Sequence, residues 1–289
     1  MKVNLGGIVP LSTLDWTGIA SAVIFMRRCP LRCPYCHNRH LQSGESFEDL
    51  SYIKKEIYEA APFITAVVLS GGEPLVQLKA SRQIAQFAKE IGLKVGLETC
   101  GYFPDRLADL LAEGLVDKVF LDIKEALRDP EYSNATGRKD IAPRVRESLE
   151  RCLESGVSLE VRTTVFPNTK KVPNMPSPSL EGLIEIGILL AKANIMSFTL
   201  QQGLPRDRED FEPIPIKMLV DISNKIKDFC GINVTIKNSP MPFQSAPYQT
   251  KLPQICQLRQ QSRSCHSCEP EISKKCTQLK ITPDLFENG

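Results

Sequence analysis

The stretch Cys29-Pro-Leu-Arg-Cys33-Pro-Tyr-Cys36 places three thiols within eight residues, on a turn stiffened by two prolines. The β-branched and apolar run at 21–26 directly before it predicts a buried strand that leads into this loop. Thiolates that converge from one tight loop suit a soft metal centre. Three of them leave a cubic iron–sulfur cluster one ligand short, so that one iron stays open to a substrate or cofactor.

A zinc knuckle is the alternative for the same thiols. Structural zinc usually takes four protein ligands, and His37 and His40 are the next side chains that could serve. His40 could close a Cys3His site. The loop therefore leaves both metals open, and the missing fourth thiol favours the iron–sulfur cluster.

Composition excludes several classes of protein. Thirty-six basic and 34 acidic residues nearly cancel, so nothing indicates a nucleic-acid-binding surface. No run of 18 apolar residues occurs and the first seven residues lack the apolar core of a signal peptide. We therefore expect a soluble, cytoplasmic protein that does not enter a membrane. Seven of the ten cysteines lie in two tight clusters, which in a reducing cytosol indicates metal sites rather than disulfides.

Strand and helix patterns alternate after the cysteine loop, which predicts a parallel α/β barrel with its chemistry at the carboxyl ends of the strands. The N-terminal segment at 1–19 shows little hydrophobic periodicity, so no regular element is predicted there. Trp16 within it is expected to be a packing anchor. Ser46 is expected to cap the first helix. Loops at 167–179 and 203–213 are too long for plain connectors and are expected to border the mouth of the barrel. The strand patterns lie at 66–69, 94–97, 116–124, 157–165, 197–202 and 232–236.

Polar residues gather where these strands end. Gly71 and Gly72 follow a buried strand, and paired glycines let backbone approach a ligand closely, while a neighbouring carboxylate can take an ammonium group. By itself the glycine pair favours a simple turn. Asp122 and Lys124 are equally consistent with a polar strand cap, and Arg162 with a salt-bridged strand residue.

The loop pattern Cys-x3-Cys-x2-Cys, with Tyr35 before its last cysteine, resembles the cluster loop of the radical S-adenosylmethionine (SAM) enzymes. Gly-Gly-Glu-Pro at 71–74 is similar to the segment that holds the methionine amino group of SAM in that family. Glu98-Thr-Cys-Gly, Leu-Asp122-Ile-Lys124 and Arg162-Thr-Thr-Val match further segments near the cofactor. The resemblance spans roughly residues 5–236 and implies an open parallel (β/α)6 partial barrel.

The resemblance also implies the chemistry. Cys29, Cys33 and Cys36 would hold a [4Fe–4S] cluster as the catalytic centre, and SAM at its open iron would be cleaved reductively to methionine and a 5′-deoxyadenosyl radical. Arg162 would hold the carboxylate or ribose of SAM, and Cys100 is not expected to be a ligand. The residues implied to bind the cofactor are Tyr35, Asn38, Gly71, Gly72, Glu73, Glu98, Thr99, Asp122, Lys124 and Arg162.

Within that superfamily the chain looks most like the glycyl-radical enzyme activating enzymes, and among them the activating proteins of anaerobic ribonucleoside-triphosphate reductase. The similar segments are Gly6-Gly-Ile-Val-Pro-Leu-Ser, His37-Asn38 and Leu-Asp122-Ile-Lys124. This implies a glycyl-radical enzyme as protein substrate and an electron donor such as flavodoxin or ferredoxin. A pyruvate formate-lyase type activase stays open, as does a radical SAM enzyme that modifies a small molecule or another protein. An electron-carrying or zinc-binding module would not need the Gly-Gly-Glu-Pro segment.

The amino-acid composition of the chain changes near Asn238, after which prolines and polar residues dominate. We therefore predict a core domain at 1–239, with its cluster loop at 27–40, and a Cys-rich tail at 240–289. Four thiols in that tail match the ligand count of one metal centre, either zinc or a second [4Fe–4S] cluster. They are Cys256, Cys265, Cys268 and Cys276.

A chain that ends at Ser239 is expected to lose one metal centre relative to the full chain. Ordering a tail with few apolar groups costs about 1–2 kcal/mol per residue in backbone entropy, which a bound metal can offset. Iron and zinc analysis of both anaerobically purified proteins measures the difference. Loss of about four irons per chain indicates a second cluster, and loss of one zinc indicates a knuckle. Equal metal content in the two proteins would contradict a second site.

Overall fold

The computed structural model describes residues 1–166, 177–203 and 213–238. Most of the two long loops predicted at the mouth of the barrel, and the whole tail from 240, lie outside the described residues. The tail cysteines therefore stay a prediction. Among the described helices, none has the length and apolar character needed to cross a membrane. The four tail cysteines concerned are Cys256, Cys265, Cys268 and Cys276.

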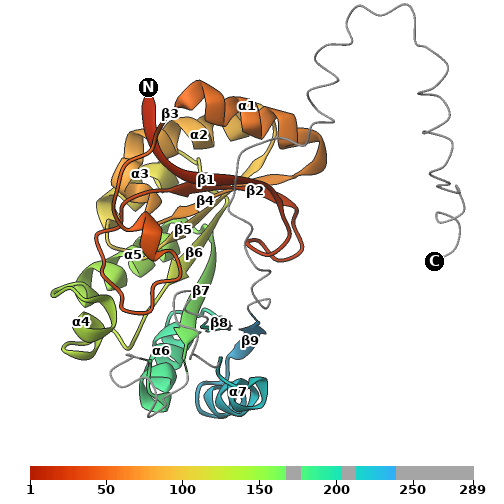
Figure 1. Cartoon of the computed structure of the whole chain (residues 1–289). Helices are drawn as coiled ribbons and strands as arrows, with labels where there is room; N and C mark the ends of the chain where they lie inside the picture. The colour runs from red at the N-terminus through yellow and green to blue at the C-terminus, as the bar shows by residue number, and fades with distance from the viewer. Residues whose placement is uncertain (167–176, 204–212, 239–289) are drawn as a thin grey trace, which may run out of the picture. The chain divides into compact units, whose positions relative to one another are not determined.

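Nine strands of the described residues form one sheet (Figure 1). They are β1 (Lys2–Ser12), β2 (Ser21–Met26), β3 (Phe47–Asp49), β4 (Ala66–Gly71), β5 (Lys94–Thr99), β6 (Lys118–Asp122), β7 (Ser158–Val165), β8 (Ser197–Gln202) and β9 (Asn233–Lys237). Their spatial order is β3-β1-β2-β4-β5-β6-β7-β8-β9. Strands β2 and β4 to β9 run parallel, and β1 and β3 are antiparallel additions at one edge.

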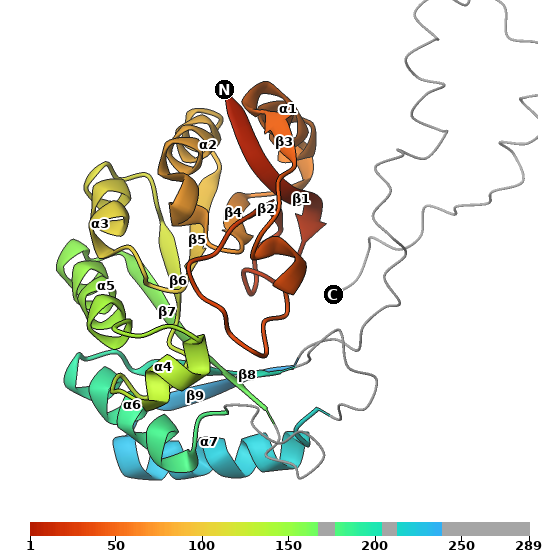
Figure 2. The same ribbon diagram turned by 60° about the vertical axis from the view of Figure 1, so that its left-hand side comes forward.

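Helices connect the parallel strands and cover one face of the sheet (Figure 2). The α-helices are α1 (Leu50–Ala60), α2 (Leu78–Glu90), α3 (Pro104–Ala112), α4 (Glu131–Thr136), α5 (Ala142–Ser155), α6 (Leu180–Lys192) and α7 (Ile216–Cys230). Short 3-10 turns lie at Arg39–Leu41, Ala61–Phe63 and Pro74–Gln77. Within the described residues β3 and β9 stand at the two ends of the strand order and do not pair with each other, so the barrel stays open. The predicted open parallel α/β barrel is confirmed.

The N-terminal segment differs from the prediction. Residues Lys2–Ser12 form the long strand β1 rather than an irregular lead-in, because β2 supplies an antiparallel partner from Leu5 to Ser12. The helix expected to begin at Ser46 begins at Leu50, since residues 47–49 pair with the start of β1. Asp49 precedes that helix, and its carboxylate lies 2.8 Å from Lys2 Nζ. Long-range pairing has overridden the local capping pattern here.

Two apolar cores lie on opposite faces of the sheet. The larger one fills the space between the strands and the helices, and includes Ile24, Leu69, Leu97 and Leu121. The smaller one lies on the inner face and contains Trp16, which is 7% exposed and packs edge-on against Phe120 with ring centroids 5.7 Å apart. The remaining members of the smaller core are Val23, Ala66 and Val68. Trp16 is therefore the packing anchor predicted from the sequence.

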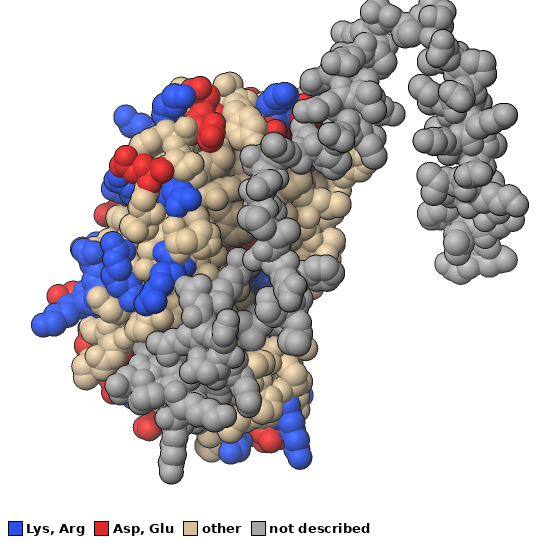
Figure 3. Space-filling model, viewed as in Figure 1, with Lys and Arg blue, Asp and Glu red and all other residues tan. Residues whose placement is uncertain are grey.

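The surface of the described residues carries charges of both signs (Figure 3). Lys and Arg side chains gather on one edge of that view, at the level of α4 and α5 in Figure 1. The near-neutral net charge of +2 therefore hides a local excess of positive charge.

The end of β4 approaches the end of β2 more closely than any side chain would allow. A Cβ at Gly71, whose φ is +119°, would lie 2.2 Å from Met26 O, and one at Gly72 would lie 2.4 Å from Arg28 O. The Gly72 and Glu73 amides donate to Met26 O and Arg28 O at 2.8 and 2.9 Å. The two glycines therefore bind β4 to the first residues of the cysteine loop.

Gly71→Ala is expected to destabilise the chain by about 2–4 kcal/mol, because left-handed strain and a backbone overlap act together. Gly92→Ala is the matched control: its φ is +82°, and its added Cβ meets nothing within 4 Å. The control should lose about 1–2 kcal/mol from strain alone. Urea unfolding of the metal-free proteins, followed by circular dichroism, measures the difference. Equal losses would show that the close approach to Met26 carries no energetic weight.

Candidate active site

The cysteine loop follows β2 and is held by backbone hydrogen bonds to residues 41–42 and to the end of α4. Arg28 N donates to Leu41 O at 2.7 Å, and Cys29 N donates to Gln42 O at 3.3 Å. Arg32 N donates to Thr136 O, at the end of α4, at 2.8 Å. These bonds set the path of the loop without using its thiols.

The three loop thiols are held away from water to different degrees. Cys33 is 7% exposed, and burial raises the pKa of its thiol to about 12. Burial also raises the pKa of Cys36, whereas a hydrogen bond with Cys100 lowers the pKa of Cys29. Metal binding at neutral pH must therefore displace a proton from Cys33. The Cys29–Cys100 contact was not expected from the sequence.

The described residues do not present a preformed site for a single metal ion. In the described part of the chain, no three His, Cys, Asp or Glu side chains are gathered closely enough to hold one metal ion. Ligands of a single zinc, each about 2.1–2.3 Å from it, must lie close together. Thiolates that bind different irons of a cluster lie further apart. The donor set of the loop, three thiols without a fourth, suits a [4Fe–4S] cluster with one iron left open.

Lys124 places a buried positive charge beside this loop. Its Nζ lies 2.7 Å from Asp122 Oδ2, and its side chain is 15% exposed. Burial opposes this charge, but Asp122, Tyr35 and Cys33 together hold the pKa of Lys124 well above its ordinary value. The ammonium in turn favours the thiolate forms of all three loop cysteines. The predicted pair of Asp122 and Lys124 thus lies at the cysteine loop.

Tyr35 presents a polar atom that the described residues do not satisfy. Its ring is 5% exposed and lies 4.7 Å from the Phe166 ring, centroid to centroid. Its hydroxyl oxygen is buried with no hydrogen-bond partner in the described structure. Such orphaned groups are rare in proteins and point to a missing ligand or water. The position of Tyr35 beside Cys33 and Lys124 therefore fits a polar cofactor.

Glu73 is buried and hydrogen-bonded within the chain. Its side chain is fully buried, and its carboxylate accepts hydrogen bonds from Thr99 Oγ1 at 3.0 Å and Cys100 N at 2.8 Å. It also accepts from Leu75 N at 3.1 Å, and burial raises its pKa. The carboxylate and the Thr99 hydroxyl thus tie β4 to β5. The part of Glu73 in cofactor binding stays a prediction, as do those of Gly71 and Gly72.

Asn38 connects the cysteine loop with the glycine segment. Its Nδ2 donates to Gly71 O at 3.4 Å. The structure thereby brings together three parts of the sequence that were predicted to share a site: the thiols, the Gly-Gly-Glu-Pro segment and the end of β6.

Arg162 is enclosed by partners on the inner face of the sheet. Its side chain is 4% exposed, and Nη1 and Nε each lie 2.7 Å from a carboxylate oxygen, of Glu98 and Glu160 respectively. Nη2 donates to Asp15 O at 2.8 Å, and the guanidinium lies 4.0 Å above the Phe120 ring. The alternative left open by the sequence, a salt-bridged strand residue, describes this geometry.

Glu98 connects Arg162 with the neighbouring strand β4. Its second oxygen accepts a hydrogen bond from Ser70 Oγ at 2.5 Å, and the side chain keeps 23% exposure. Burial raises the pKa of Glu98 and the charge of Arg162 opposes this rise. Glu160 differs, because despite its burial Arg162 and Lys118 hold its pKa below the ordinary value. Arg162 therefore positions Glu98 at the carboxyl end of β5.

Several participants were missed by the sequence reasoning. Ser70, Lys118 and Glu160 join the inner-face network, and Tyr132 Oη accepts a hydrogen bond from Lys124 N at 3.3 Å. Glu160 and Arg162 are two residues apart on one strand, so their side chains lie on the same face of the sheet. This spacing is a signal from which Glu160 could have been predicted as a partner of Arg162. The other contacts join residues far apart in the sequence.

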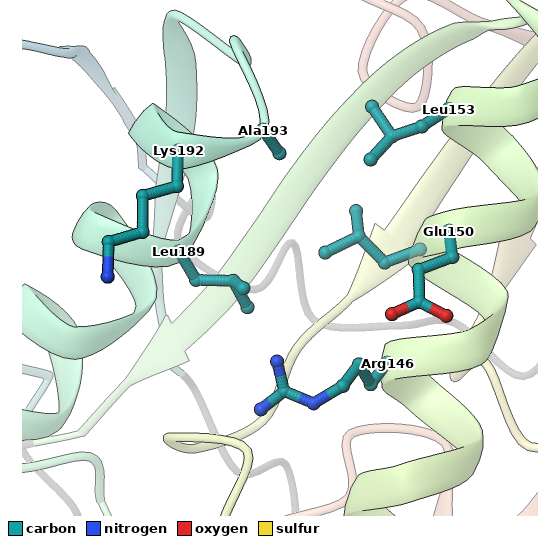
Figure 4. Close-up of a pocket in the computed structure, with 7 residues that line it drawn as sticks. Arg146, Glu150, Leu153, Leu189, Lys192 and Ala193 are labelled. Carbon is teal, nitrogen blue, oxygen red and sulfur yellow. The ribbon is translucent and has the colours of Figure 1, made fainter.

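A surface hollow between α5 and α6 lies apart from this site (Figure 4). Arg146 and Glu150 line it from α5, and Leu189 and Lys192 line it from α6. None of the predicted site residues lines it, and we assign it no part in the chemistry.

Comparison with known proteins gives the family. Residues 23–172, more than half of the chain, match the model of the radical SAM superfamily. The chain belongs to the radical SAM superfamily. The family resemblance drawn from the sequence is confirmed, and membership implies a [4Fe–4S] cluster and SAM as cofactors. This radical SAM enzyme is therefore expected to load both groups at the cysteine loop.

Two relatives show which kind of radical SAM enzyme the chain is similar to. The radical SAM chain is 31% identical over 230 residues to a protein of Methanocaldococcus jannaschii that bears the name of a glycyl-radical enzyme activating enzyme, covering 75% of this chain and 87% of that protein. It is 28% identical over 186 residues to the pyruvate formate-lyase-activating enzyme of Clostridium pasteurianum, covering 60% and 75%. The superfamily member is thus similar to glycyl-radical activating enzymes.

A solved structure shows the same fold. The crystal structure of Streptococcus suis SuiB bound to its precursor peptide SuiA aligns with a TM-score of 0.58 at 15% identity, covering 76% of this chain and 48% of that one. The radical SAM chain therefore spans about half of SuiB, and the likeness concerns the fold alone.

Arg162→Met is expected to cost about 3–5 kcal/mol of stability, because it leaves the Glu98 carboxylate buried without its cation. Loss of the cation raises the folded-state pKa of Glu98 further above its unfolded value. A carboxyl with a raised pKa costs stability once it ionises, so the loss should grow from pH 5 to pH 8. Urea unfolding of the metal-free protein at both values measures it.

The double variant Glu98→Gln/Arg162→Met is the control. It removes the unpaired charge, while Glu160 keeps Lys118 Nζ at 2.7 Å. It should be less destabilised than the single variant at pH 8. A single variant no worse than the double at either pH would contradict the coupling.

Proposed function

We propose that this chain activates a glycyl-radical enzyme, and that its substrate is a glycine of anaerobic ribonucleoside-triphosphate reductase. The observation that carries the radical chemistry is the meeting of the three loop thiols with Gly71–Gly72 at the carboxyl ends of adjacent parallel strands. Membership of the radical SAM superfamily and similarity to activating enzymes support the reaction class. The choice of the reductase rests on the sequence segments at 6–12 and 37–38 and on Leu-Asp122-Ile-Lys124.

When bound on Cys29, Cys33 and Cys36, a [4Fe–4S] cluster supplies the electron that cleaves SAM to methionine and a 5′-deoxyadenosyl radical. The residues of the chain would bind SAM and orient it toward the cluster. Gly71 and Gly72 present backbone atoms beside the loop, where an amino group can be held. Lys124 supplies a buried positive charge that suits a carboxylate, with its pKa kept high by Asp122, Tyr35 and Cys33. Binding energy spent in this way fixes the geometry of the reacting groups.

Exclusion of water is the second task of the site, because a carbon radical would be quenched by stray donors. Cys33 and Tyr35 are 7% and 5% exposed, and Phe166 packs on the Tyr35 ring. The Tyr35 hydroxyl, which lacks a described partner, would gain one from a polar cofactor. The same residues thus shield the site and bind in it.

Other roles predicted from the sequence enter here as proposals. The Cys-rich tail would hold a second metal centre on Cys256, Cys265, Cys268 and Cys276. The electron would come from a low-potential donor such as flavodoxin or ferredoxin. A pyruvate formate-lyase type of activase is the second candidate, favoured by the similarity to the enzyme of Clostridium pasteurianum.

Electron paramagnetic resonance should show a glycyl doublet when the anaerobically loaded chain, SAM and a reductant are mixed with anaerobic ribonucleoside-triphosphate reductase. The doublet and 5′-deoxyadenosine should both depend on SAM. Cys33→Ala should abolish them, because it removes a cluster ligand. Cys152→Ala is the matched control, since Cys152 lies in the core on α5 at 1% exposure and should leave both products intact.

The alternatives give different results in the same experiment. A doublet that forms with pyruvate formate-lyase but not with the reductase favours the second candidate. Formation of 5′-deoxyadenosine with no protein radical on either partner contradicts glycyl activation. A Cys33→Ala protein that still cleaves SAM contradicts the cluster assignment.

A further inference from the structure

A positively charged surface adjoins the cysteine loop on its outer side. We define this arginine surface as Arg32, Arg138, Lys139 and Arg144 together with Tyr102. The guanidinium carbons of Arg138 and Arg144 lie 5.1 and 5.0 Å from the centroid of the Tyr102 ring. Tyr102 follows β5, Arg138 follows α4 and Arg144 lies on α5. Two arginines from the connection between β6 and β7 thus meet an aromatic ring from the connection between β5 and β6.

The arginine surface is bonded directly to the loop that carries the thiols. Arg138 Nη1 donates to Pro30 O at 3.1 Å, and Arg32 Nη1 donates to Cys29 O at 2.7 Å. Gly137, with φ at +64°, lets the chain pass so close that an added Cβ would lie 2.7 Å from Arg32 O. A protein seated on this surface would therefore contact arginines that are hydrogen-bonded to the backbone of Cys29 and Pro30.

Positive charge on this surface is not neutralised within the described chain. Its four cationic side chains are exposed, and none of them forms an ion pair with a described residue. Other surface arginines, such as Arg128 and Arg151, are paired with two carboxylates each. Figure 3 shows Lys and Arg side chains gathered on one edge of that view, at the level of α4 and α5 in Figure 1.

We infer that the arginine surface docks an acidic protein that delivers single electrons to the site. This inference rests on the proposed radical SAM chemistry, which consumes one electron in each reductive cleavage. In the step itself the donor is oxidised by one electron, the bound [4Fe–4S] cluster is reduced by one, and no bond forms or breaks. Opposite charges steer such encounters and raise association rates by about 10 to 1,000-fold.

The location favours an electron donor over the protein that supplies the glycine. A glycine must reach the reacting carbon on the inner side of the sheet, at the strand ends. An electron needs only a short path to a thiolate, and Pro30 and Cys29 provide it through the loop backbone. Arg144 lies on α5, in the helical layer outside the sheet, so this surface suits a partner that stays outside.

The test is the rate at which a low-potential acidic flavodoxin, in its hydroquinone form, reduces the anaerobically loaded chain. The variant Lys139→Glu/Arg144→Glu reverses two charges and retains the bonds of Arg138 and Arg32 to the loop. Stopped-flow absorbance and the paramagnetic signal of the reduced cluster are followed at low and high salt. The rate should fall tenfold or more at low salt and converge with the wild-type rate at high salt.

Two controls separate docking from damage to the site. Photoreduced deazariboflavin, a small neutral reductant, should reduce the variant and the wild-type chain at equal rates. Lys225→Glu/Lys227→Glu changes the net charge equally on the exposed side of α7 and should leave the flavodoxin rate unchanged.

The reduction assay contains no glycyl-radical enzyme, so failure of the proposed substrate would not affect it. An unchanged flavodoxin rate in the Lys139→Glu/Arg144→Glu variant overturns the inference. So does a normal flavodoxin rate combined with lost binding of the glycyl-radical partner, which would assign this surface to the substrate protein.

Discussion

The close approach of two backbones, at Met26–Arg28 and Gly71–Glu73, is the constraint on which the site depends. The amides of Gly72 and Glu73 donate to Met26 O and Arg28 O, and neither glycine has room for a side chain. This contact holds the beginning of the cysteine loop against the end of the neighbouring strand. Without it, the thiols and the segment expected to hold the amino group of SAM would not lie next to each other.

Glu73 extends this constraint to the next strand. Its carboxylate is buried with neutral donors, Thr99 Oγ1 and the amides of Cys100 and Leu75, instead of a cation. A buried carboxylate is costly unless its hydrogen bonds are complete, so the segment is stable only when β4, β5 and the loop are all in place. The contact between Cys100 and Cys29 follows from the same arrangement, since Cys100 lies next to Thr99.

Charged side chains lie on both sides of the cysteine loop, and they are largely buried on the inner side and exposed on the outer side. Inside, Arg162 holds Glu98 at the end of β5, and Lys124 with Asp122 places a positive charge beside the thiols. Outside, Arg138 and Arg144 flank Tyr102 without ion pairs to described residues. Buried charges with complete partners specify geometry, whereas exposed ones with none are free to meet another protein.

The sequence alone determined the features that depend on local order. The spacing of Cys29, Cys33 and Cys36, the glycine pair after a buried strand and the alternation of strands with helices are all carried by neighbouring residues. What only the tertiary structure decided were contacts between distant segments: the pairing of β1 with β2 and β3, the buried hydrogen bonds of Glu73, and the enclosure of Arg162 by Glu98 and by Asp15, which is 147 residues away. Periodicity shows that a side chain belongs to one face of a strand. Which partner it meets there depends on how the whole sheet brings remote residues together, because a buried charge takes the partner that the packed strands place within its reach.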